Sequence, residues 1–487
     1  MKEFGPVSQP PTTTTTPIAA ISQQIWDMKY RLKSPDGRPV DKTIDDTWDR
    51  VATALAARED DPETWAPQFR DALTNFKFLP AGRIISGAGT DRMVTLFNCF
   101  VMGEIPDDMS GIFDNLKEAA LTMQQGGGIG YDFSTLRPKG ALVKRVGADA
   151  SGPLSFMDVW DSMCRTIMSA GSRRGAMMAT MRCDHPDIED FIEAKREPGR
   201  LRMFNLSVLV TDAFMQAVKE DASWELTFGG TVHRSLPARE LWDKIMRGTY
   251  AYAEPGVIFI DRINQQNPIK NVGTIEATNP CGEQPLHAWD SCNLGSVNLG
   301  NLVKGDGPDA TFDWAAYKSI IHSTTRFLDN VIEVNRYPLP QIDNMSKTTR
   351  RIGLGVMGFA DALYKMGIGY NTPEGTAFGE EVMRVLDDES HLASEMLAEE
   401  RGCFPAWEGS DWEAQGRKMR NSYTTTVAPT GTISIIANCS GGIEPMFSLA
   451  FNRQVMKDTE GKPTIMREVN YVFEEKAKEA EKIAKAE

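Results

Sequence analysis

The sequence has no long hydrophobic run and no signal-peptide pattern. None of its apolar stretches approaches the length that a membrane-spanning helix needs. The first twenty residues carry Pro10, Pro11 and a threonine run at 12–16, but no continuous apolar segment. Hydrophobic residues make up 41% of the chain and charged residues 25%, which is ordinary for a globular protein. We therefore expect a soluble protein with no membrane partner, whose residues 1–20 form a flexible tail.

The chain also lacks an excess of positive charge, since 53 lysines and arginines stand against 67 aspartates and glutamates and the formal net charge at pH 7 is -14. A protein that binds nucleic-acid polymers in general needs a strong positive field to gain affinity from phosphate neutralisation. The charge balance therefore argues against a nucleic-acid polymer as a partner. It leaves local basic sites for small phosphates open.

Cysteine is sparse and unpatterned. The chain has seven cysteines, an odd number spread over 487 residues, which does not indicate the dense disulfide framework of a small secreted protein. A reducing cytoplasm is the expected location. No Cys-x-x-Cys pair occurs, and Cys183 and His185 stand too close together for a standard zinc finger. We expect no metal ligand set.

The length allows roughly three average domains, or one large α/β barrel with an appendage. Apolar residues such as Trp48, Val51 and Leu55, at spacings of three and four, predict a small helical unit over residues 21–80. Beyond it, short apolar runs alternate with longer amphipathic stretches, which is the α/β pattern. These runs are 97–102, 206–210, 257–260 and 424–428.

The last segment, 456–487, is rich in charge. Glu474 and Lys478 stand four residues apart, as do Glu481 and Lys485, and this spacing supports a solvated helix. We expect a charged helical tail there.

The most informative thiol is Cys281, which lies between Asn279-Pro280 and Gly282-Glu283. A nucleophilic thiol usually needs a histidine or another cation beside it, and Glu283 would instead raise its pKa. A buried core cysteine, a nucleophile and the carrier of a sulfur-centred radical all remain open. An uncharged thiol beside a carboxylate favours the radical role, and Cys292 and Cys99 are two further thiols that could exchange electrons.

Three polar turns suggest anion binding. Residues 125–130 form a glycine-rich turn, but Tyr131 stands where the dinucleotide fingerprint requires its third glycine, so a tight turn is favoured when this motif is taken alone. Residues 429–434 offer three hydroxyls that would suit phosphate oxygens at a helix N-terminus, or simply cap a helix. Residues 171–176 place Arg173 and Arg174 on a glycine-flanked loop, which fits an anionic ligand or a solvated loop equally well.

Taken together, these motifs resemble the ribonucleotide reductases, and within them the adenosylcobalamin-dependent class. The resemblance runs from about Ile21 to Arg453. The motifs that carry it, in the order of the family, are Leu79 to Arg83, Asn98 to Val101, Gly126 to Gly130, Arg173 to Ala176, His185 to Ile188, Asn279 to Glu283, and Pro429 to Ser434.

The resemblance implies a ten-stranded α/β barrel over residues 81–455, with a radical-bearing cysteine on a loop threaded into its centre. It implies reduction of ribonucleotides, specifically ribonucleoside diphosphates, to 2′-deoxyribonucleotides as DNA precursors. Cys281 would abstract the ribose 3′ hydrogen, Glu283 would take the 3′-hydroxyl proton, and Asn279 would hydrogen-bond the substrate. Cys99 and Cys292 would supply two electrons and close to a disulfide as the 2′-hydroxyl leaves as water.

The resemblance also implies nucleotide-binding positions. The substrate contacts it assigns are Asn98, Gly128, Pro429, Thr430, Gly431, Thr432 and Ile433. The positions it assigns to a deoxynucleotide effector are Asp107 and Arg137, with Arg173 and Arg174 in the loop that links effector to substrate.

Cys281 and Cys292 are eleven residues apart. This spacing resembles that of the cobalamin class more than that of the large subunit of the di-iron enzymes. Adenosylcobalamin is the expected cofactor, although no Asp-x-His-x-x-Gly cobalamin motif appears, so its contacts stay unassigned. Two alternatives remain: the large subunit of a di-iron reductase, and a catalytically silent nucleotide-binding regulator. Asn279, Cys281 and Glu283 argue against the silent regulator.

Family members continue beyond the equivalent of Arg453 with further barrel strands and a cysteine pair that relays electrons from thioredoxin. No cysteine follows Cys439 in this chain. We therefore expect a separate C-terminal polypeptide to complete the barrel. A thioredoxin-type reductant and a second copy of the chain in a homodimer are the other expected partners.

Overall fold

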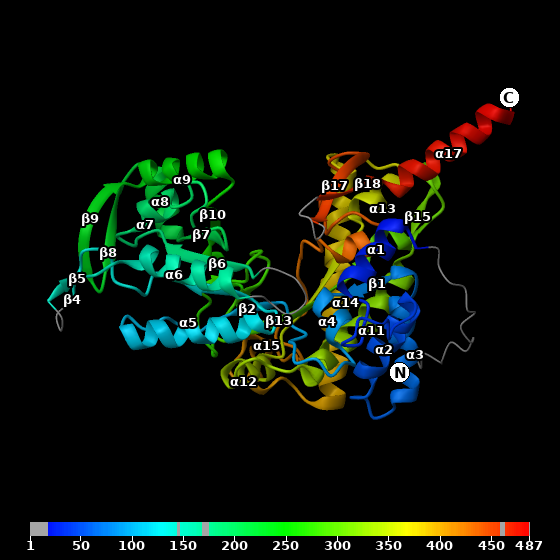
Figure 1. The fold of residues 1–487 in the computed structure, drawn as a ribbon, viewed down its shortest axis with the longest axis horizontal. Coiled ribbons are helices and arrows are strands. Elements are labelled where there is room, and N and C mark those ends of the chain that lie inside the picture. The colour runs from blue at the N-terminus through cyan, green and yellow to red at the C-terminus, as the bar shows by residue number, and fades with distance from the viewer. Residues whose placement is uncertain (1–17, 144–146, 168–174, 458–462, 487) are drawn as a thin grey trace.

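The computed structural model describes residues 18–143, 147–167, 175–457 and 463–486. Nearly all of the expected tail at 1–20 lies outside these ranges, as do Arg173 and Arg174. Figure 1 shows two parts that meet near strands β2 (Cys99–Val101) and β13 (Ser291–Asn298). Helices dominate the part that holds both ends of the described chain, and the other part alternates strands with helices.

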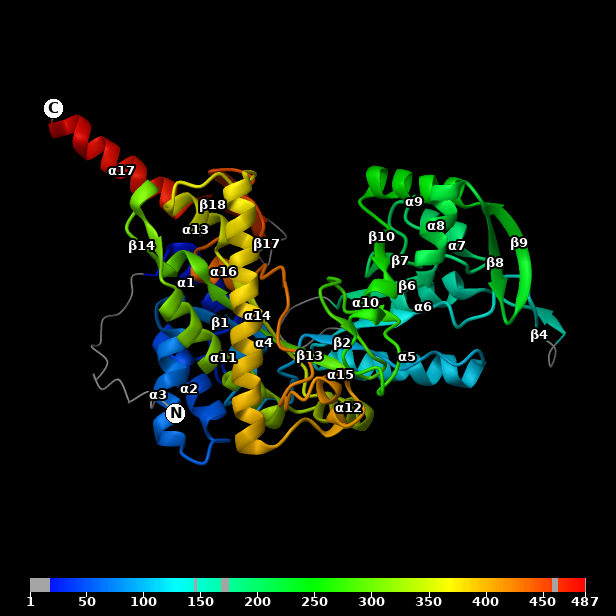
Figure 2. The same ribbon diagram turned by 180° about the vertical axis from the view of Figure 1, so that it is seen from behind.

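Three helices occupy the segment in which the apolar spacing predicts helices. They are α1 (Ala20–Lys29), α2 (Ile44–Ala56) and α3 (Pro62–Leu73). Helix α2 begins at a capping box, in which the Thr43 side chain accepts a hydrogen bond from Asp46 N and the Asp46 side chain accepts one from Thr43 N. Its apolar stripe is buried against α3 and α11 (Trp314–Val334). Figure 2 shows α14 (Pro373–Arg401) running beside α11, so the N-terminal unit is packed on helices that come much later in the chain.

The main sheet has eight strands in the residues that the structure describes. Five of them are parallel neighbours, in the order β2, β3 (Gly128–Asp132), β6 (Met177–Arg182), β7 (Phe204–Val210) and β10 (Gly256–Phe259). Parallel neighbours need crossover connections. The helices in these connections are α5 (Met109–Gln124), α6 (Pro153–Thr166), α7 (Ile188–Glu193), α8 (Asp212–Glu220) and α9 (Ala238–Tyr252). The α/β class expected from the sequence is confirmed.

Strand β13 joins the parallel strands to the rest of the sheet. It pairs antiparallel with β2 and with β1 (Phe78–Pro80), and parallel with β16 (Ile352–Met357). The resemblance implies ten strands, and the described sheet has eight. The apolar run 424–428 forms no strand of its own, but follows β16 through the bonds Leu354 N to Thr424 O (2.8 Å) and Thr426 N to Leu354 O (3.0 Å). The pairing ends before Pro429, which has no N–H to donate.

The two faces of the parallel sheet bury different residues. Successive side chains on a strand point to opposite faces. Phe100, Ile129, Tyr131, Met177, Ala179, Phe204, Leu206 and Val208 belong to the large hydrophobic core. The alternate residues Cys99, Gly128, Gly130, Thr180 and Asn205 therefore occupy the other face, where the strand β11 (Ala277–Thr278) lies against β3 and β6. This inner face positions the site.

The segment 456–487 is helical only in its second half. Strand β17 (Ala450–Lys457) pairs antiparallel with β18 (Pro463–Val469), and helix α17 (Tyr471–Ala486) follows. The expected tail thus contains a strand, because residues 463–469 find their hydrogen-bond partners on the neighbouring β17. Within α17, Lys478 Nζ lies 2.9 Å from Glu474 Oε1, which is the pair that the spacing predicts.

The remaining elements are short or lie at the periphery. The helices are α4 (Gly82–Gly87), α10 (Ile260–Gln265), α12 (Pro340–Thr349), α13 (Phe359–Lys365), α15 (Asp411–Ala414) and α16 (Ile433–Ala437). The strands are β4 (Leu142–Val143), β5 (Ala148–Asp149), β8 (Ser223–Phe228), β9 (Thr231–Pro237), β12 (Pro285–Leu286), β14 (Val303–Lys304) and β15 (Thr311–Phe312). Among the described residues, no helix combines the length and the apolar character that crossing a membrane requires.

Candidate active site

The Cys281 motif forms the tip of a small hairpin between β11 and β12. Asn279 N donates to Gln284 O at 3.1 Å, and Asn279 Oδ1 accepts from Gln284 N at 3.0 Å, so one asparagine closes the loop twice. Gly282 N donates to Asn279 O at 3.0 Å, with Gly282 at φ 84°, a left-handed conformation that glycine adopts without strain. The loop therefore presents Cys281 as an exposed side chain at its tip. We call residues 279–284 the thiol loop.

The stem of the thiol loop lies unusually close to the sheet. A Cβ atom added at Gly130 of β3 would stand 1.8 Å from Thr278 O. Real Cβ atoms are not found at such a distance, so only glycine lets β11 approach β3 in this way. The expectation that the loop is threaded against the inner face of a barrel sheet agrees with this close approach.

Two of the three thiols face each other across the sheet. Cys99 of β2 and Cys292 of β13 are register partners in an antiparallel pair, so their side chains leave the same face. Directly opposite residues have Cβ atoms about 4.5–5.5 Å apart, and a disulfide needs about 3.5–4.5 Å. A small shift would thus allow a bond between them. Cys99 is 3% exposed and Cys292 is 0% exposed, which seals the pair from bulk solvent.

Burial keeps both thiols protonated. It raises the pKa of Cys99 well above its ordinary value, and the Glu283 carboxylate beside it raises that pKa further. Burial likewise raises the pKa of Cys292, although the Arg351 cation acts in the opposite direction. The pair therefore carries hydrogen as S–H at neutral pH.

The thiol loop is hydrogen-bonded directly to Cys99. Asn279 Nδ2 donates to Cys99 Sγ at 3.1 Å, and Cys99 Sγ–H donates to Glu283 Oε1 at 3.7 Å. Burial raises the pKa of Glu283. These contacts bring Asn279 and Glu283 to Cys99, although Cys99 and Glu283 are 184 positions apart in the sequence.

Two acceptor atoms at this place are unsatisfied. Glu283 Oε2 and Asn98 Oδ1 are buried, and neither has a hydrogen-bond partner among the residues that the structure describes. A buried acceptor without a donor costs about 1–3 kcal/mol. The Glu283 carboxylate contacts Cys99, so its unsatisfied oxygen offers an acceptor beside the thiols to a ligand that carries its own donors, such as the hydroxyls of a sugar.

The turn at 429–433 starts close to the thiols. Ala428 belongs to the same buried cluster as Cys99 and Cys292, so Pro429 leaves the sheet beside them. Thr430 has φ 50°, and its Oγ1 accepts from Gly442 N at 2.7 Å. Thr432 stands at the N-cap of α16 and makes no side-chain capping bond there. The simple capping interpretation of this motif is therefore not what the structure shows. The remaining predicted substrate contact, Gly128, donates its N–H to Asn98 O at 2.9 Å.

Asp107 and Arg137 lie together, and Asp107 stands two residues before the start of α5. Arg137 Nε lies 2.9 Å from Asp107 Oδ2, Arg137 N donates to Asp107 Oδ1 at 3.1 Å, and Arg137 Nη2 donates to Asp107 O at 3.0 Å. The motif at His185 supports this region, because Asp187 Oδ2 accepts from Lys139 N at 2.9 Å. Arg173 and Arg174, the other two predicted effector positions, lie outside the described residues.

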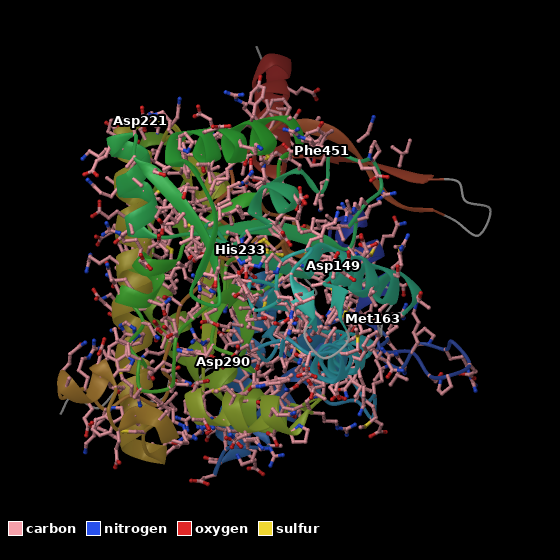
Figure 3. All side chains as sticks on the ribbon, turned by 90° about the vertical axis from the view of Figure 1, so that its left-hand side faces the viewer. Asp149, Met163, Asp221, His233, Asp290 and Phe451 are labelled. Atoms are coloured by element: carbon pink, nitrogen blue, oxygen red, sulfur yellow. The ribbon has the colours of Figure 1, made fainter. Side chains whose placement is uncertain are left out.

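A buried ion pair at the start of β13 was not predicted. Arg351 Nε lies 2.9 Å from Asp290 Oδ2, and the Arg351 guanidinium stacks 3.7 Å from the centroid of the Tyr423 ring. Asp290, which Figure 3 labels, sits two residues before Cys292. Although burial opposes it, the Arg351 cation holds the pKa of Asp290 below its usual range. The signal in the sequence that could have revealed this ion pair is Arg351 itself, a charged residue immediately before the apolar strand 352–357.

No group of three or more histidine, cysteine, aspartate or glutamate residues in the described ranges is arranged to hold a metal ion. Cys183 is buried and Asp184 is paired with Arg182. His185 is buried, and its Nε2 lies 2.9 Å from Leu136 O. These residues therefore have structural partners.

Comparison with known protein families identifies the class of protein to which this fold and thiol site belong. The sequence matches the family model described as ribonucleotide reductase, barrel domain, over residues 97–418 and 413–487. It matches the one described as ribonucleotide reductase, all-alpha domain, over residues 19–93. The chain belongs to the ribonucleotide reductase family, which confirms the resemblance seen in the sequence.

Individual relatives narrow the comparison. The chain is 46% identical over 442 residues to the vitamin B12-dependent ribonucleoside-diphosphate reductase of Thermoplasma acidophilum, an alignment that covers 90% of this chain and 56% of that protein. It is 43% identical over 447 residues to the protein of the same name from Mycobacterium tuberculosis strain H37Rv, covering 90% and 62%. The ribonucleoside-diphosphate reductase subunit alpha of Chlamydia pneumoniae is 28% identical over 504 residues, covering 88% and 47%. The chain thus spans about half to two thirds of the length of these relatives.

Proposed function

We propose that this chain carries the catalytic centre of an adenosylcobalamin-dependent ribonucleotide reductase that acts on ribonucleoside diphosphates. The observation that carries the proposal is the connected set of Asn279, Cys99 and Glu283, with Cys292 opposite Cys99 and Cys281 at the tip of the same loop. The products, 2′-deoxyribonucleotides, would supply DNA synthesis.

Cys281, Glu283 and Asn279 each take a different step of the reaction. A thiyl radical at Cys281 takes the hydrogen atom from the ribose 3′ carbon, forming S–H as the C–H bond breaks. Glu283 takes the proton of the 3′-hydroxyl, and its raised pKa makes it a stronger proton acceptor. Asn279 donates a hydrogen bond to the substrate from the loop that it closes.

The thiol pair supplies the reducing equivalents. As the bond from the 2′ carbon to its hydroxyl breaks, the oxygen leaves as water. Cys99 and Cys292 together give up two protons and two electrons and form a disulfide: one proton joins the leaving hydroxyl to make water, and the other proton, with the two electrons, forms the new C–H bond at the 2′ carbon. Because both thiols are protonated and enclosed, protons and electrons can be delivered without bulk water. The hydrogen atom then returns from Cys281 to the 3′ carbon, which restores the thiyl radical.

The unsatisfied acceptors support a ribose at this place. Asn98 Oδ1 and Glu283 Oε2 would accept from ribose hydroxyls. The backbone of Gly128, whose N–H donates to Asn98 O, would lie beside the ribose. The diphosphate would lie on the turn formed by Pro429, Thr430, Gly431, Thr432 and Ile433. We assign the effector deoxynucleotide to the region of Asp107 and Arg137, linked to the substrate by the loop with Arg173 and Arg174.

The cobalamin assignment rests on the relatives and on the exposure of one thiol. Adenosylcobalamin, when bound, supplies the radical that removes the hydrogen atom of the Cys281 thiol. Cys281 is exposed at the loop tip while Cys99 and Cys292 are buried, which fits a group that must reach only the first of these thiols. The relatives named for vitamin B12 are 43–46% identical, against 28% for a subunit alpha, which favours this class over the di-iron alternative.

A complete enzyme would need partners. A thioredoxin-type reductant would reopen the disulfide, and a second copy of the chain would form a homodimer. The cytoplasmic location expected from the cysteine usage also stays a prediction.

The test is ribonucleoside diphosphate reduction by the purified chain with adenosylcobalamin and dithiothreitol, with and without a polypeptide that corresponds to the remainder of the relatives. Deoxynucleotide formation that requires adenosylcobalamin supports the proposal. Activity that requires a di-iron protein instead, or effector binding without reduction in either mixture, would contradict it in favour of the two alternatives.

A further inference from the structure

One contact of the thiol loop belongs to none of the motifs described above. Asn205, in strand β7, donates from Nδ2 to the carbonyl oxygen of Pro280 at 2.6 Å. The two residues are 75 positions apart in the sequence. Asn205 follows Phe204, which is in the hydrophobic core, so its side chain points to the inner face of the sheet. The amide thus reaches the loop from the side opposite the crossover helices.

The contacted carbonyl is part of the peptide unit that leads to Cys281. A peptide unit is planar, so fixing the Pro280 oxygen also fixes the nitrogen of Cys281 and the direction in which its Cα leaves. On the same residue, the Pro280 ring packs on β3, where a Cβ added at Gly128 would stand 3.0 Å from Pro280 Cγ. The ring holds one side of this peptide unit, and Asn205 holds the oxygen on the other.

The bonds of Asn279 and Gly282 act elsewhere in the thiol loop. Asn279 is bonded to Gln284, and Gly282 is bonded to Asn279, so these bonds close the loop on itself. The bond from Asn279 to Cys99 ties the base of the loop to β2. Asn205 contacts the loop next to the reactive thiol. It lies on strand β7, which is held rigidly because it is paired with β6 on one side and β10 on the other.

We propose that Asn205 is a positioning residue that aims the Cys281 thiol by clamping the Pro280 carbonyl. The proposal rests on the function proposed above, since it concerns the placement of the same thiol. A hydrogen-atom transfer needs its two heavy atoms within a few ångströms along a fixed line, so a small rotation of the peptide unit would slow the reaction more than it would weaken substrate binding.

Side-chain chemistry allows a sharp test of the clamp. In Asn205→Asp the carboxylate would face the Pro280 oxygen without a hydrogen to donate, and only its protonated form could restore the bond. In Asn205→Ala the bond is lost at every pH. Asn271→Ala is the matched control, because Asn271 also donates from Nδ2 to backbone carbonyls, those of Ala406 and Glu408. It lies eight residues before the thiol loop, so it tests whether losing any such bond nearby in the sequence loosens the loop.

The first measurement is hydrogen–deuterium exchange of the purified chain over residues 277–286. Losing the clamp should make the amides of Gly282 and Gln284 exchange about tenfold faster in Asn205→Ala, since the loop opens locally without it. The strands β6 and β7 should exchange as in the wild type, and Asn271→Ala should leave residues 277–286 unchanged. Unchanged exchange of these residues in Asn205→Ala would overturn the clamp.

The second measurement is the pH dependence of ribonucleotide reduction in the reconstituted enzyme. We expect kcat of Asn205→Ala to fall about 10–100-fold with KM within about twofold of the wild type. The kcat of Asn205→Asp, taken relative to the wild type at each pH, should rise as the pH falls towards the aspartate pKa, whereas that of Asn205→Ala should stay constant. A purely structural role would not produce this difference between the two variants.

The two measurements separate the inference from the function on which it rests. Faster loop exchange in Asn205→Ala together with wild-type kcat would overturn the positioning role. Faster loop exchange in a chain whose wild type never reduces ribonucleotides would support the clamp and overturn the proposed function instead.

Discussion

Cys281 stands apart from the other two thiols of the site in its accessibility. It is exposed at the tip of a turn, whereas Cys99 and Cys292 are enclosed between two strands and under the thiol loop. Residue types alone do not create this difference, because all three are cysteines. Their separate roles follow from the surroundings that each side chain meets.

Replacing Cys281 by serine should abolish reduction while nucleotide binding is retained. The serine O–H bond is too strong for the hydrogen-atom transfer, yet the side chain has nearly the same size and the loop bonds of Asn279 do not involve it. Turnover and equilibrium binding of the nucleotide should be measured on the same preparation. Cys403→Ser serves as the control, with wild-type turnover. Residual turnover in Cys281→Ser would reject the radical role.

Glu283 should set the acidic limb of the pH profile. Its carboxylate form is the base, and burial raises its pKa, so the active form is lost as the pH falls at a higher pH than for an ordinary glutamate. In Glu283→Gln the remaining activity should be low, by about 10²–10⁴-fold, and should lack this limb. The measurement is kcat against pH for both proteins. An acidic limb that survives unchanged in the variant would show that another group is responsible.

At the scale of elements, the site depends on how closely β11 approaches β3. Gly130 is the position where the two backbones nearly touch, and β13 carries Cys292 to the place opposite Cys99. The strand pattern of the sequence foretold α/β alternation, and the runs at 97–102, 206–210 and 257–260 overlap strands. The sheet order and the register were not accessible in this way, because pairing partners are chosen by contacts between residues distant in sequence.

Gly130→Ala should therefore damage the site from within the sheet. The added methyl group would overlap Thr278 O, so either β11 or β3 must move, at a cost of about 1–3 kcal/mol. We expect a lower melting temperature and a fall in kcat larger than that in Asn205→Ala. Gly248→Ala in α9 is the control, since its Cβ would meet only ordinary contacts at 3.4 Å or more and alanine favours a helix. Equal stability of Gly130→Ala and the wild type would show that the close approach is not required.

At the scale of the whole molecule, buried charges join the N-terminal helices to the later ones. Glu59 Oε2 lies 2.6 Å from Arg326 Nη2 of α11 and 2.5 Å from Arg401 Nη2 of α14, and its side chain is 1% exposed. Asn330 Nδ2 adds a bond of 2.6 Å to Oε1. One carboxylate thus connects segments separated by 267 to 342 residues.

Glu59→Gln should destabilise the fold by about 1–3 kcal/mol, because it removes the buried carboxylate from its charged hydrogen bonds while Arg326 keeps Glu400 and Arg401 keeps Asp329 as charge partners. Although burial opposes it, Arg326 and the other donors hold the pKa of Glu59 below its ordinary value of 4.5. The stabilising contribution is therefore present above that pH and is lost as the pH falls through the lowered pKa. Thermal unfolding between pH 7 and 3 should show the wild type losing this advantage over Glu59→Gln. A constant difference across that range would exclude the linkage.

The sequence by itself determined the family, and it supplied the candidate residues of the site as predictions. Motifs such as Asn279 to Glu283 are local, so their chemistry and order can be recognised without coordinates, and helical spacing or alternating runs reflect local burial. The structure pairs the predicted effector residues Asp107 and Arg137 with each other, and their role in effector binding stays a prediction. The assignments of individual roles stay predictions until the variants are measured.

Only the tertiary structure decided which of these residues meet. It set Cys99 opposite Cys292, tied Asn279 and Glu283 to Cys99, and brought Asn205 to the Pro280 carbonyl. Local sequence does not encode such contacts, because strand pairing and backbone approach depend on the packing of the whole sheet around the loop. The same reason explains the strand at 463–469, whose partner β17 was needed to distinguish it from the charged helix that follows.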